Sequence, residues 1–270
     1  MSKATRMEQI KTDLDYLRLV RAGEVFAELA EAAETAGTDH LEYLAAVLSA
    51  EVDHTRQRRL SARLRFAHFP FRKTLEEFDF DFQPSIDKKL ILDLAELDFV
   101  AEGRPVLLLG RPGCGKSHLG VALGIKAVEA GYRGYFTGAT EMTKALVGAW
   151  AEGTFNQKIR TYTAPSVLII DDVGITPFDR TEANAFFQVV NRRYELRSAT
   201  IVTTNRGLPA WAELFGGDSV VAAAILDRLL DRAKVINIKG PSWRLREHEA
   251  LTKPLADMSE TSEKAPRRRG

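Results

Sequence analysis

The chain has 270 residues, enough for one large domain or for a main domain with a small accessory one, and we favour the second. Its 38 Lys and Arg residues balance 37 Asp and Glu residues, which leaves a formal net charge of +1, so any nucleic-acid surface must be a local patch. A single cysteine, Cys114, excludes an intrachain disulfide framework, and no apolar run is long enough to cross a bilayer. We therefore expect a cytoplasmic protein that does not bind a membrane.

Residues 1–70 predict a small all-helical N-terminal domain. Apolar residues recur at helical spacing, and Gly23 and Gly37 divide the stretch into three predicted helices. Asp39, with an acidic residue three positions later, resembles a capping box at the start of the third helix. Pro70 is expected to end that helix, because proline disfavours the helical conformation in the residue before it.

The third predicted helix carries a basic stripe. Arg56, Arg59 and Arg63 are spaced i, i+3 and i+7 and therefore share one helix face. Such a stripe can neutralise the backbone phosphates of double-stranded DNA with little sequence preference. The alternative is an ordinary solvated helix face.

Residues 71–103 are interpreted as a junction that leads into the main domain. Phe78, Phe80 and Phe82 alternate with acidic residues, which predicts an extended segment with the three rings on one face. Packing against the next domain is the favoured interpretation of these rings. Contact with a nucleotide base is the alternative.

Residues 104–248 alternate between apolar runs and amphipathic stretches, which predicts an α/β domain with a parallel sheet flanked by helices. The predicted strands are Val106–Leu109, Gly134–Thr137, Val167–Asp171, Thr200–Thr204 and Val235–Ile238. Helices are predicted from Lys116 and near Glu141–Trp150, Thr181–Leu196 and Val220–Leu230. Residues 249–270 lose this pattern, and we expect them to be a disordered tail. The tryptophans of the main domain are interpreted as packing residues: Trp150, Trp211 and Trp243.

The turn after the first predicted strand matches GxxxxGK[ST] at every required position, which is the phosphate-loop signature. Backbone N–H groups and a helix N-terminus there favour a di- or triphosphate. Lys116 is expected to reach the β- and γ-phosphates, and Ser117 to offer its hydroxyl to Mg²⁺. A glycine-rich turn is the alternative. The predicted nucleotide-binding residues of this stretch are Gly110, Arg111, Pro112, Gly113, Cys114, Gly115, Lys116, Ser117 and His118.

Two acidic residues follow the most apolar predicted strand. Asp171 emerges beside the phosphate loop and is the candidate metal ligand that accompanies Ser117. Asp172 is the candidate that orients or activates the attacking water. A simple turn after a strand is the alternative for this pair.

Two further polar residues complete the predicted catalytic set. The amide of Asn205, at the end of the next strand, can hydrogen-bond the water or the γ-phosphate, although Asn also commonly ends strands. Arg228, on the last predicted helix, can stabilise developing charge in the site of a neighbouring subunit. The alternative for Arg228 is a surface ion pair with Asp227 or Asp231.

In this order the motifs resemble the AAA+ superfamily, and several segments are similar to the IstB family, the ATP-binding helper proteins of insertion-sequence transposition that are related to DnaC helicase loaders. These segments are the basic helix, Lys73–Phe80, GRPGCGKSHLGVALG, LIIDDVG, TTN, Asp227–Leu229 and Gly240–Arg244. The resemblance spans residues 10–248. It implies an AAA+ ATPase that uses ATP and Mg²⁺, forms a homo-oligomer on double-stranded DNA and delivers the target to a cognate transposase.

The resemblance also implies roles for single residues. Asn205 takes the sensor position, Arg228 the arginine-finger position, and Arg244 the second-sensor position with Arg246 as the fallback. Asp172 stands where most hydrolysing AAA+ proteins have glutamate, so a nucleotide-gated DNA-binding module with little hydrolysis is one alternative. A DnaC-like helicase loader is another. A P-loop kinase is disfavoured because the sequence shows no acceptor pocket and no arginine-rich lid.

Overall fold

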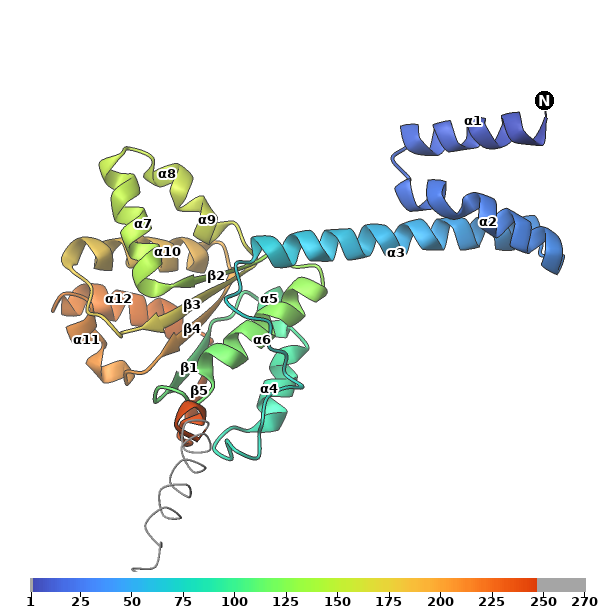
Figure 1. Cartoon of the computed structure of the whole chain (residues 1–270). Coiled ribbons are helices and arrows are strands. Elements are labelled where there is room, and N and C mark those ends of the chain that lie inside the picture. Colours follow the sequence, from blue (N-terminus) through green and yellow to red (C-terminus); the bar gives the residue numbers. More distant parts are fainter. Residues whose placement is uncertain (1, 247–270) are drawn as a thin grey trace, which may run out of the picture. The chain divides into compact units, whose positions relative to one another are not determined.

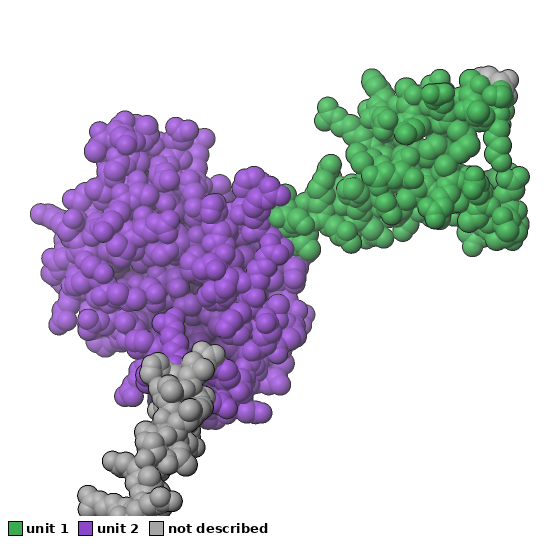
Figure 2. All heavy atoms as spheres, viewed as in Figure 1, with its two compact units in different colours: residues 1–63 green, residues 64–270 purple. Residues whose placement is uncertain are grey.

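The computed structural model describes residues 2–246, and the chain divides into two compact units, residues 1–63 and 64–270 (Figures 1 and 2). The predicted tail, residues 249–270, lies outside the described residues. Within the described part of the chain, no helix is both long and apolar enough to cross a membrane.

The first unit is helical, as predicted. It contains α1 (Lys3–Tyr16), α2 (Val20–Ala36) and most of α3 (His40–Phe66). Its core is small and is formed by the buried side chains of Ala22, Phe26 and Val47. Partly buried residues of all three helices pack around this core, so each helix contributes to it.

The break between α2 and α3 lies where the sequence predicts it. Gly37 adopts the left-handed conformation with φ 66° and ends α2, which glycine does without a Cβ penalty. Oδ1 of Asp39 then accepts hydrogen bonds from the backbone N–H groups of Leu41 (2.7 Å) and Glu42 (3.0 Å). This contact satisfies two of the free donors at the start of α3.

The predicted break at Gly23 is wrong, because Gly23 lies inside α2. The chain turns instead at residues 17–19, where Arg18 adopts a left-handed φ of 60°. Arginine has no special preference for the left-handed conformation, so the residue type does not predict a turn at this position. The end of α3 also differs from the prediction: the helix stops at Phe66, before Pro70, and His68 turns the chain with φ 55°.

The second unit is built on one parallel sheet with strand order β2-β3-β4-β1-β5 (Figure 1). The strands are β1 (Val106–Gly110), β2 (Gly134–Gly138), β3 (Val167–Val173), β4 (Ala199–Thr204) and β5 (Lys234–Ile238). All five predicted strands are confirmed. The three central strands, β3, β4 and β1, are buried along almost their whole length, which fits a sheet that is covered on both faces.

Helices cover both faces of the sheet because alternate strand residues point to opposite sides. On one face Leu108 and Ile169 pack with α4 (Lys88–Ala95), α5 (Asp98–Ala101) and α6 (Lys116–Glu129). On the other face Leu107 and Ile170 pack with α7 (Ala139–Ala151), α10 (Arg180–Glu195) and α12 (Ser219–Leu230). Short helical segments complete the connections: α8 (Phe155–Lys158), α9 (Arg160–Thr163), η1 (Leu208–Ala210) and α11 (Trp211–Leu214).

The stretch around Phe78–Phe82, predicted to be extended, instead forms turns. The rest of the junction contains α4 and α5, two helices that the sequence does not predict. Phe78, Phe80 and Phe82 do not share one face: the rings of Phe78 and Phe80 meet edge to face at 4.9 Å, and Phe82 meets Trp243 at 5.0 Å. Burying aromatic rings against different neighbours outweighs the extended alternation that the sequence suggests.

The strand order places the candidate site. Because β4 lies between β1 and β3, the carboxyl ends of these three strands form one continuous edge. The phosphate loop follows β1, Asn205 follows β4, and Asp171 lies near the end of β3. Polar groups from three distant chain segments therefore meet at the sheet edge where ligands of open α/β sheets usually bind.

Candidate nucleotide-binding site

The phosphate loop connects β1 to the N-terminus of α6. Gly113 and Gly115 have φ values of 78° and 98°, which a residue with a side chain rarely adopts. A Cβ at Gly115 would also come within 2.7 Å of the Phe78 ring. The two glycines therefore allow the loop to curl with its backbone N–H groups exposed for an anion.

Lys116 begins α6 and is only 5% exposed. Its Nζ donates a hydrogen bond of 3.0 Å to the carbonyl oxygen of Arg111, across the phosphate loop. The ammonium group therefore lies over the hollow of the loop, where a phosphate anion can replace the carbonyl as its partner. Cys114 is buried beneath the loop, and burial raises the pKa of its thiol.

Ser117 and Asp171 come together, as predicted for a metal site. Ser117 Oγ donates a hydrogen bond of 2.9 Å to Asp171 Oδ1. Two cis ligands of octahedral Mg²⁺ at about 2.1 Å from the ion lie roughly 2.9 Å apart. The two oxygens are thus spaced as neighbouring ligands of one Mg²⁺.

The described residues contain no group of three or more His, Cys, Asp or Glu side chains that could hold a metal ion. Mg²⁺ usually takes one or two carboxylate ligands from a protein and fills its other positions with substrate phosphates and water.

Asp172 projects into the same region, although Asp171 and Asp172 differ strongly in burial. Asp171 is 9% exposed, whereas Asp172 is exposed to a cavity that Lys116 and Asn205 also line. Desolvation and then repulsion from Asp171 raise the pKa of the Asp172 carboxyl, and Lys116 and Arg244 act in the opposite direction. A raised pKa makes a carboxylate a better proton acceptor.

This phosphate-side cavity has a volume of about 360 Å³ and gathers most of the predicted site. Its lining includes the predicted residues Pro112, Gly113, Gly115, Lys116, Ser117, His118, Asp172, Asn205 and Arg244. Oδ1 of Asn205 is a buried atom with no hydrogen-bond partner among the described residues. An unpaired buried acceptor is costly, which makes the amide a candidate to bind a ligand or a water.

The structure separates Arg244 from its fallback, Arg246. Arg244 lines the phosphate-side cavity. Arg246 instead lies over the rings of Phe82 (4.8 Å) and Trp243 (5.1 Å), and its guanidinium is 3.7 Å from Asp79. Of the two arginines, the geometry therefore favours Arg244 for contact with phosphate.

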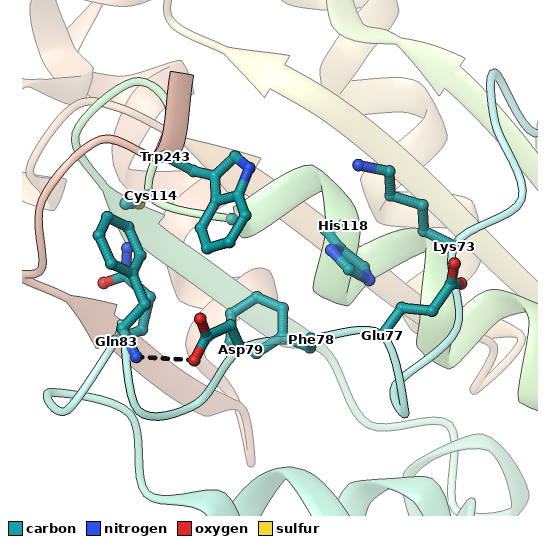
Figure 3. Close-up of a pocket in the computed structure, with 10 residues that line it drawn as sticks. Lys73, Glu77, Phe78, Asp79, Gln83, Cys114, His118 and Trp243 are labelled. Carbon is teal, nitrogen blue, oxygen red and sulfur yellow. Dashed lines mark hydrogen bonds between the residues drawn. The ribbon is translucent and has the colours of Figure 1, made fainter. Parts of the chain in front are cut away.

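A second cavity of about 170 Å³ adjoins the first and shares Lys73, Gly115, His118 and Trp243 with it (Figure 3). Its walls include the aromatic rings of Phe78, Phe82 and Trp243. A cavity with aromatic walls beside a phosphate loop suits a nucleobase. The base-contact alternative for the phenylalanines thus fits the geometry for Phe78 and Phe82.

Two hydrogen bonds stabilise the part of this second cavity, here called the base-side cavity, that is formed by Gln83 and Trp243. Gln83 Nε2 donates to the carbonyl oxygen of Pro241 at 2.7 Å, and the N–H of Trp243 donates to the carbonyl oxygen of Gly113 at 2.9 Å. On the other side, His118 Nε2 lies 2.8 Å from the carbonyl oxygen of Thr74, and burial lowers the pKa of the imidazole. Trp243, which the sequence suggests is a packing residue, therefore lies at a cavity.

The sequence does not predict three residues of this region: Thr203, whose hydroxyl donates a hydrogen bond to Asp171 Oδ1, and Gln83 and Trp243 at the second cavity. Gln83 and Pro241 are 158 residues apart in sequence, so no local spacing relates them. The sequence signal for Thr203 is that it begins the TTN run, which ends at Asn205. The packing interpretation of Trp211 is confirmed, because its side chain is fully buried.

Arg228 does not reach the phosphate-side cavity of its own chain. Its Nε donates to Asn191 Oδ1 at 2.6 Å, and its guanidinium lies 5.0 Å from the Phe187 ring centroid. It lines a small cavity with Pro105 and Ser198, which precede β1 and β4, so it lies at the opposite edge of the sheet. The alternative for Arg228, an ion pair with Asp227 or Asp231, is absent among the described contacts, where Arg232 pairs with Asp231.

The three arginines of the basic stripe lie on α3, where their spacing brings them to one face. Arg56 and Arg59 are exposed and Arg63 is half-buried. The side chain of Arg56 is 3.8 Å from Asp53, its weak intrahelical partner. The stripe is accessible to a polyanion along most of its length.

A five-stranded parallel sheet in this order, with a phosphate loop after β1 and an acidic pair at the end of β3, defines an AAA+ P-loop protein. Solved structures agree on this fold. DnaI has a TM-score of 0.53 and 24% identity over 62% of this chain and 91% of its own. AMPPCP-bound DnaA from Aquifex aeolicus has a TM-score of 0.53 and 23% identity over 63% of this chain and 51% of its own.

The chain belongs to the IstB-like ATP binding protein family, which matches residues 12–250. A protein named for ATP binding in insertion sequence IS21 of Pseudomonas aeruginosa is 40% identical over 257 residues, which are 94% of this chain and 96% of that relative. Its counterpart in IS5376 of Geobacillus stearothermophilus is 38% identical and covers 89% and 95%. The family and the fold predicted from the sequence are both confirmed.

Proposed function

We propose that this protein is a Mg²⁺-dependent ATPase that assembles as a homo-oligomer on double-stranded DNA and serves a cognate transposase. The observation that carries the ATPase part is the 2.9 Å contact between Ser117 and Asp171 beside the phosphate-side cavity. A nucleotide-binding module without hydrolysis would not need a second carboxylate, Asp172, directed at the same cavity.

The residues of the chain divide the work of hydrolysis. Lys116 exchanges its hydrogen bond to Arg111 for the β- and γ-phosphates of ATP. Asp172 orients the attacking water and accepts its proton, and the amide of Asn205 holds that water or a γ-phosphate oxygen. Ser117 and Asp171 would hold Mg²⁺, which would supply positive charge next to the phosphates.

The oligomer is proposed because Arg228 lies at the sheet edge opposite its own phosphate loop. An arginine there can complete the catalytic site of a neighbouring copy, where it stabilises the charge that develops on the transferred phosphoryl group. In this arrangement ATP binding strengthens the contact between copies, and hydrolysis weakens it.

The basic stripe supports the proposed binding of DNA, and the similar proteins support the proposed transposase partner. Arg56, Arg59 and Arg63 offer a sequence-independent contact with backbone phosphate. The relatives that cover nearly the whole chain belong to insertion sequences, in which a transposase is the natural partner. A DnaC-like helicase loader is the second candidate, which the resemblance seen in the sequence leaves open.

The test is co-sedimentation of the protein with duplex DNA, with and without ATP and Mg²⁺, together with phosphate release in the same samples. Assembly that depends on ATP and is accompanied by phosphate release supports the proposal. Lys116→Ala should lose both signals, whereas Lys126→Ala, a surface lysine of the same helix that pairs with Glu76, should keep them. Assembly without phosphate release would reduce the protein to a nucleotide-gated module, and indifference to DNA would refute the transposition role.

The DNA surface is tested by changing Arg56, Arg59 and Arg63 together to Ala. Affinity for duplex DNA should fall, and the slope of log K against log salt should flatten by about 0.9 for each DNA phosphate that is no longer neutralised. A matched variant removes three positive charges from α1 instead, at Lys3, Arg6 and Lys11. Equal losses in the two variants would contradict a specific role for the stripe.

A further inference from the structure

The ladder between β3 and β4 is interrupted at the acidic pair. Ile170 lies opposite Val202, and the next paired residues are Val173 and Thr204. Two residues of β3, Asp171 and Asp172, therefore face a single residue of β4, Thr203. This two-against-one arrangement is a β-bulge, which re-aims side chains and is rare between parallel strands.

Thr203 fills the gap that the bulge leaves. Its side chain is completely buried, and its Oγ1 accepts a hydrogen bond of 2.9 Å from the backbone N–H of Asp172. The same hydroxyl donates a hydrogen bond of 2.5 Å to Asp171 Oδ1. One hydroxyl thus acts as acceptor for one acidic residue and as donor to the other.

The contact with Asp172 supports a strained backbone. Asp172 has φ 59°, a left-handed conformation that residues with a side chain seldom adopt unless their surroundings hold it. Without the Thr203 hydroxyl, the N–H of Asp172 loses its hydrogen-bond partner at the bulge. The left-handed turn is what separates the two neighbouring carboxylates, one bonded inside the sheet edge and one facing the phosphate-side cavity.

The contact with Asp171 restricts the metal-binding oxygen. Oδ1 of Asp171 receives hydrogen bonds from both Thr203 and Ser117. These two donors fix the rotation of the carboxylate before a cation arrives, as outer partners of metal ligands commonly do. Thr203 itself is not among the residues that line the phosphate-side cavity, so it acts through the two aspartates.

We propose that Thr203 is a positioning residue that sets Asp171 for Mg²⁺ binding and turns Asp172 toward the attacking water. This inference rests on the proposed ATPase function for its kinetic part only. Its structural part is the dependence of Mg²⁺ binding on the Thr203 hydroxyl. This part is measured through ATP affinity and does not require that the protein hydrolyses ATP.

The experiment compares Thr203→Val, which keeps the shape and removes the hydroxyl, with Thr203→Ser, which keeps the hydroxyl. Thr204→Val is the matched control: Thr204 is equally buried and next in the chain, but its hydroxyl donates to the carbonyl oxygen of Val173 at 2.6 Å and touches neither carboxylate. Thermal unfolding establishes that each variant is folded.

The first readout is ATP affinity measured with Mg²⁺ and again with EDTA. We expect Thr203→Val to lose about tenfold or more of the Mg²⁺-dependent gain in affinity, and to match the wild type in EDTA. Thr203→Ser and Thr204→Val should keep the gain. An unchanged Mg²⁺ gain in Thr203→Val would overturn the inference, and so would its loss in Thr203→Ser. Should Thr203→Val fail to fold, Thr203→Ala replaces it, and Thr203→Ser still decides.

The second readout is steady-state hydrolysis. Thr203→Val should lower kcat about tenfold or more with saturating Mg²⁺, with a smaller change in KM for ATP, because the water-orienting Asp172 is displaced. An equal kcat would remove the role toward Asp172. If the wild type itself releases no phosphate, the proposed ATPase function fails, while the comparison of ATP affinities still tests Thr203.

Discussion

Ser117 Oγ and Asp171 Oδ1 lie 2.9 Å apart, although the two residues are 54 positions apart in the chain. The hydroxyl comes from the first turn of α6, which follows β1, and the carboxylate comes from the end of β3. In the sheet, β4 lies between β1 and β3. The 2.9 Å spacing supports the proposal that both oxygens bind a single Mg²⁺.

Asp171→Ala should abolish Mg²⁺-dependent phosphate release, because it removes the carboxylate that accepts the hydrogen bond of Ser117. ATP binding in EDTA should persist, since the phosphate loop and Lys116 are unchanged. Isothermal titration with ATP and a phosphate-release assay check the two parts. Asp93→Ala, at an exposed position of α4, is the control and should behave as wild type. Full turnover in Asp171→Ala would exclude the assigned metal role.

Arg228→Ala should lower turnover about a thousandfold in the assembled protein, the usual effect of losing an arginine finger. Mixing Arg228→Ala with Lys116→Ala should restore part of the activity, because one copy then supplies a phosphate loop and the other an arginine. Arg232→Ala, which removes a neighbouring arginine paired with Asp231, should retain activity. No recovery at any mixing ratio would argue that Arg228 does not act between copies.

Trp243→Ala should weaken ATP binding about tenfold, since stacking of a base on an aromatic ring contributes about 1–3 kcal/mol. Binding of inorganic triphosphate should hardly change, because Trp243 forms a wall of the base-side cavity. Trp150→Ala is the control. Trp150 lies on α7, and its ring stacks on the ring of Phe155 with the centroids 4.4 Å apart. Equal losses for ATP and triphosphate would show that Trp243 supports the phosphate loop rather than the base.

Arg193→Lys should destabilise the second unit by about 3 kcal/mol, measured by urea unfolding. The guanidinium of Arg193 is buried and donates to Thr200 Oγ1 and to four backbone carbonyl oxygens, of Tyr162, Pro165, Ser166 and Ala199. Lysine cannot reach all of these acceptors from one ammonium group. The neighbouring Arg192→Lys should change stability by less than about 0.5 kcal/mol.

Glu51→Gln should weaken the start of α2, where Glu51 Oε2 accepts a hydrogen bond of 2.9 Å from the N–H of Ala22. That bond lowers the pKa of the Glu51 carboxyl, so its stabilisation is complete above the ordinary glutamate pKa and declines as pH falls through the lowered value. Amide hydrogen exchange at Ala22 should therefore be faster in Glu51→Gln at neutral pH, by an amount equivalent to about 1 kcal/mol.

The difference in exchange between wild type and Glu51→Gln should shrink toward low pH, after correction for intrinsic rates. The control is Glu24→Gln, because Glu24 pairs with Arg21 on the surface of the same helix. A difference that is constant with pH would mean that the charge of Glu51 does not contribute.

The sequence by itself determined the sheet, the helices α6, α7, α10 and α12 that follow its strands, and the phosphate loop. Each depends on residues close together in the chain: apolar runs such as Val167–Ile170 form buried strands, and the loop glycines with Lys116 and Ser117 fill one contiguous motif. Because the carboxyl ends of parallel strands meet at one edge, the grouping of Asp171 with the loop was also predictable.

Only the tertiary structure decided which side chains support and extend that site. Thr203 joins two carboxylates through a bulge, Gln83 meets the Pro241 carbonyl, and Phe82 packs against Trp243. Tertiary packing also moved the first helix break to Arg18. These contacts join segments far apart in the chain, or conformations that many residue types can adopt, so no local pattern encodes them; packing of the whole unit selects them.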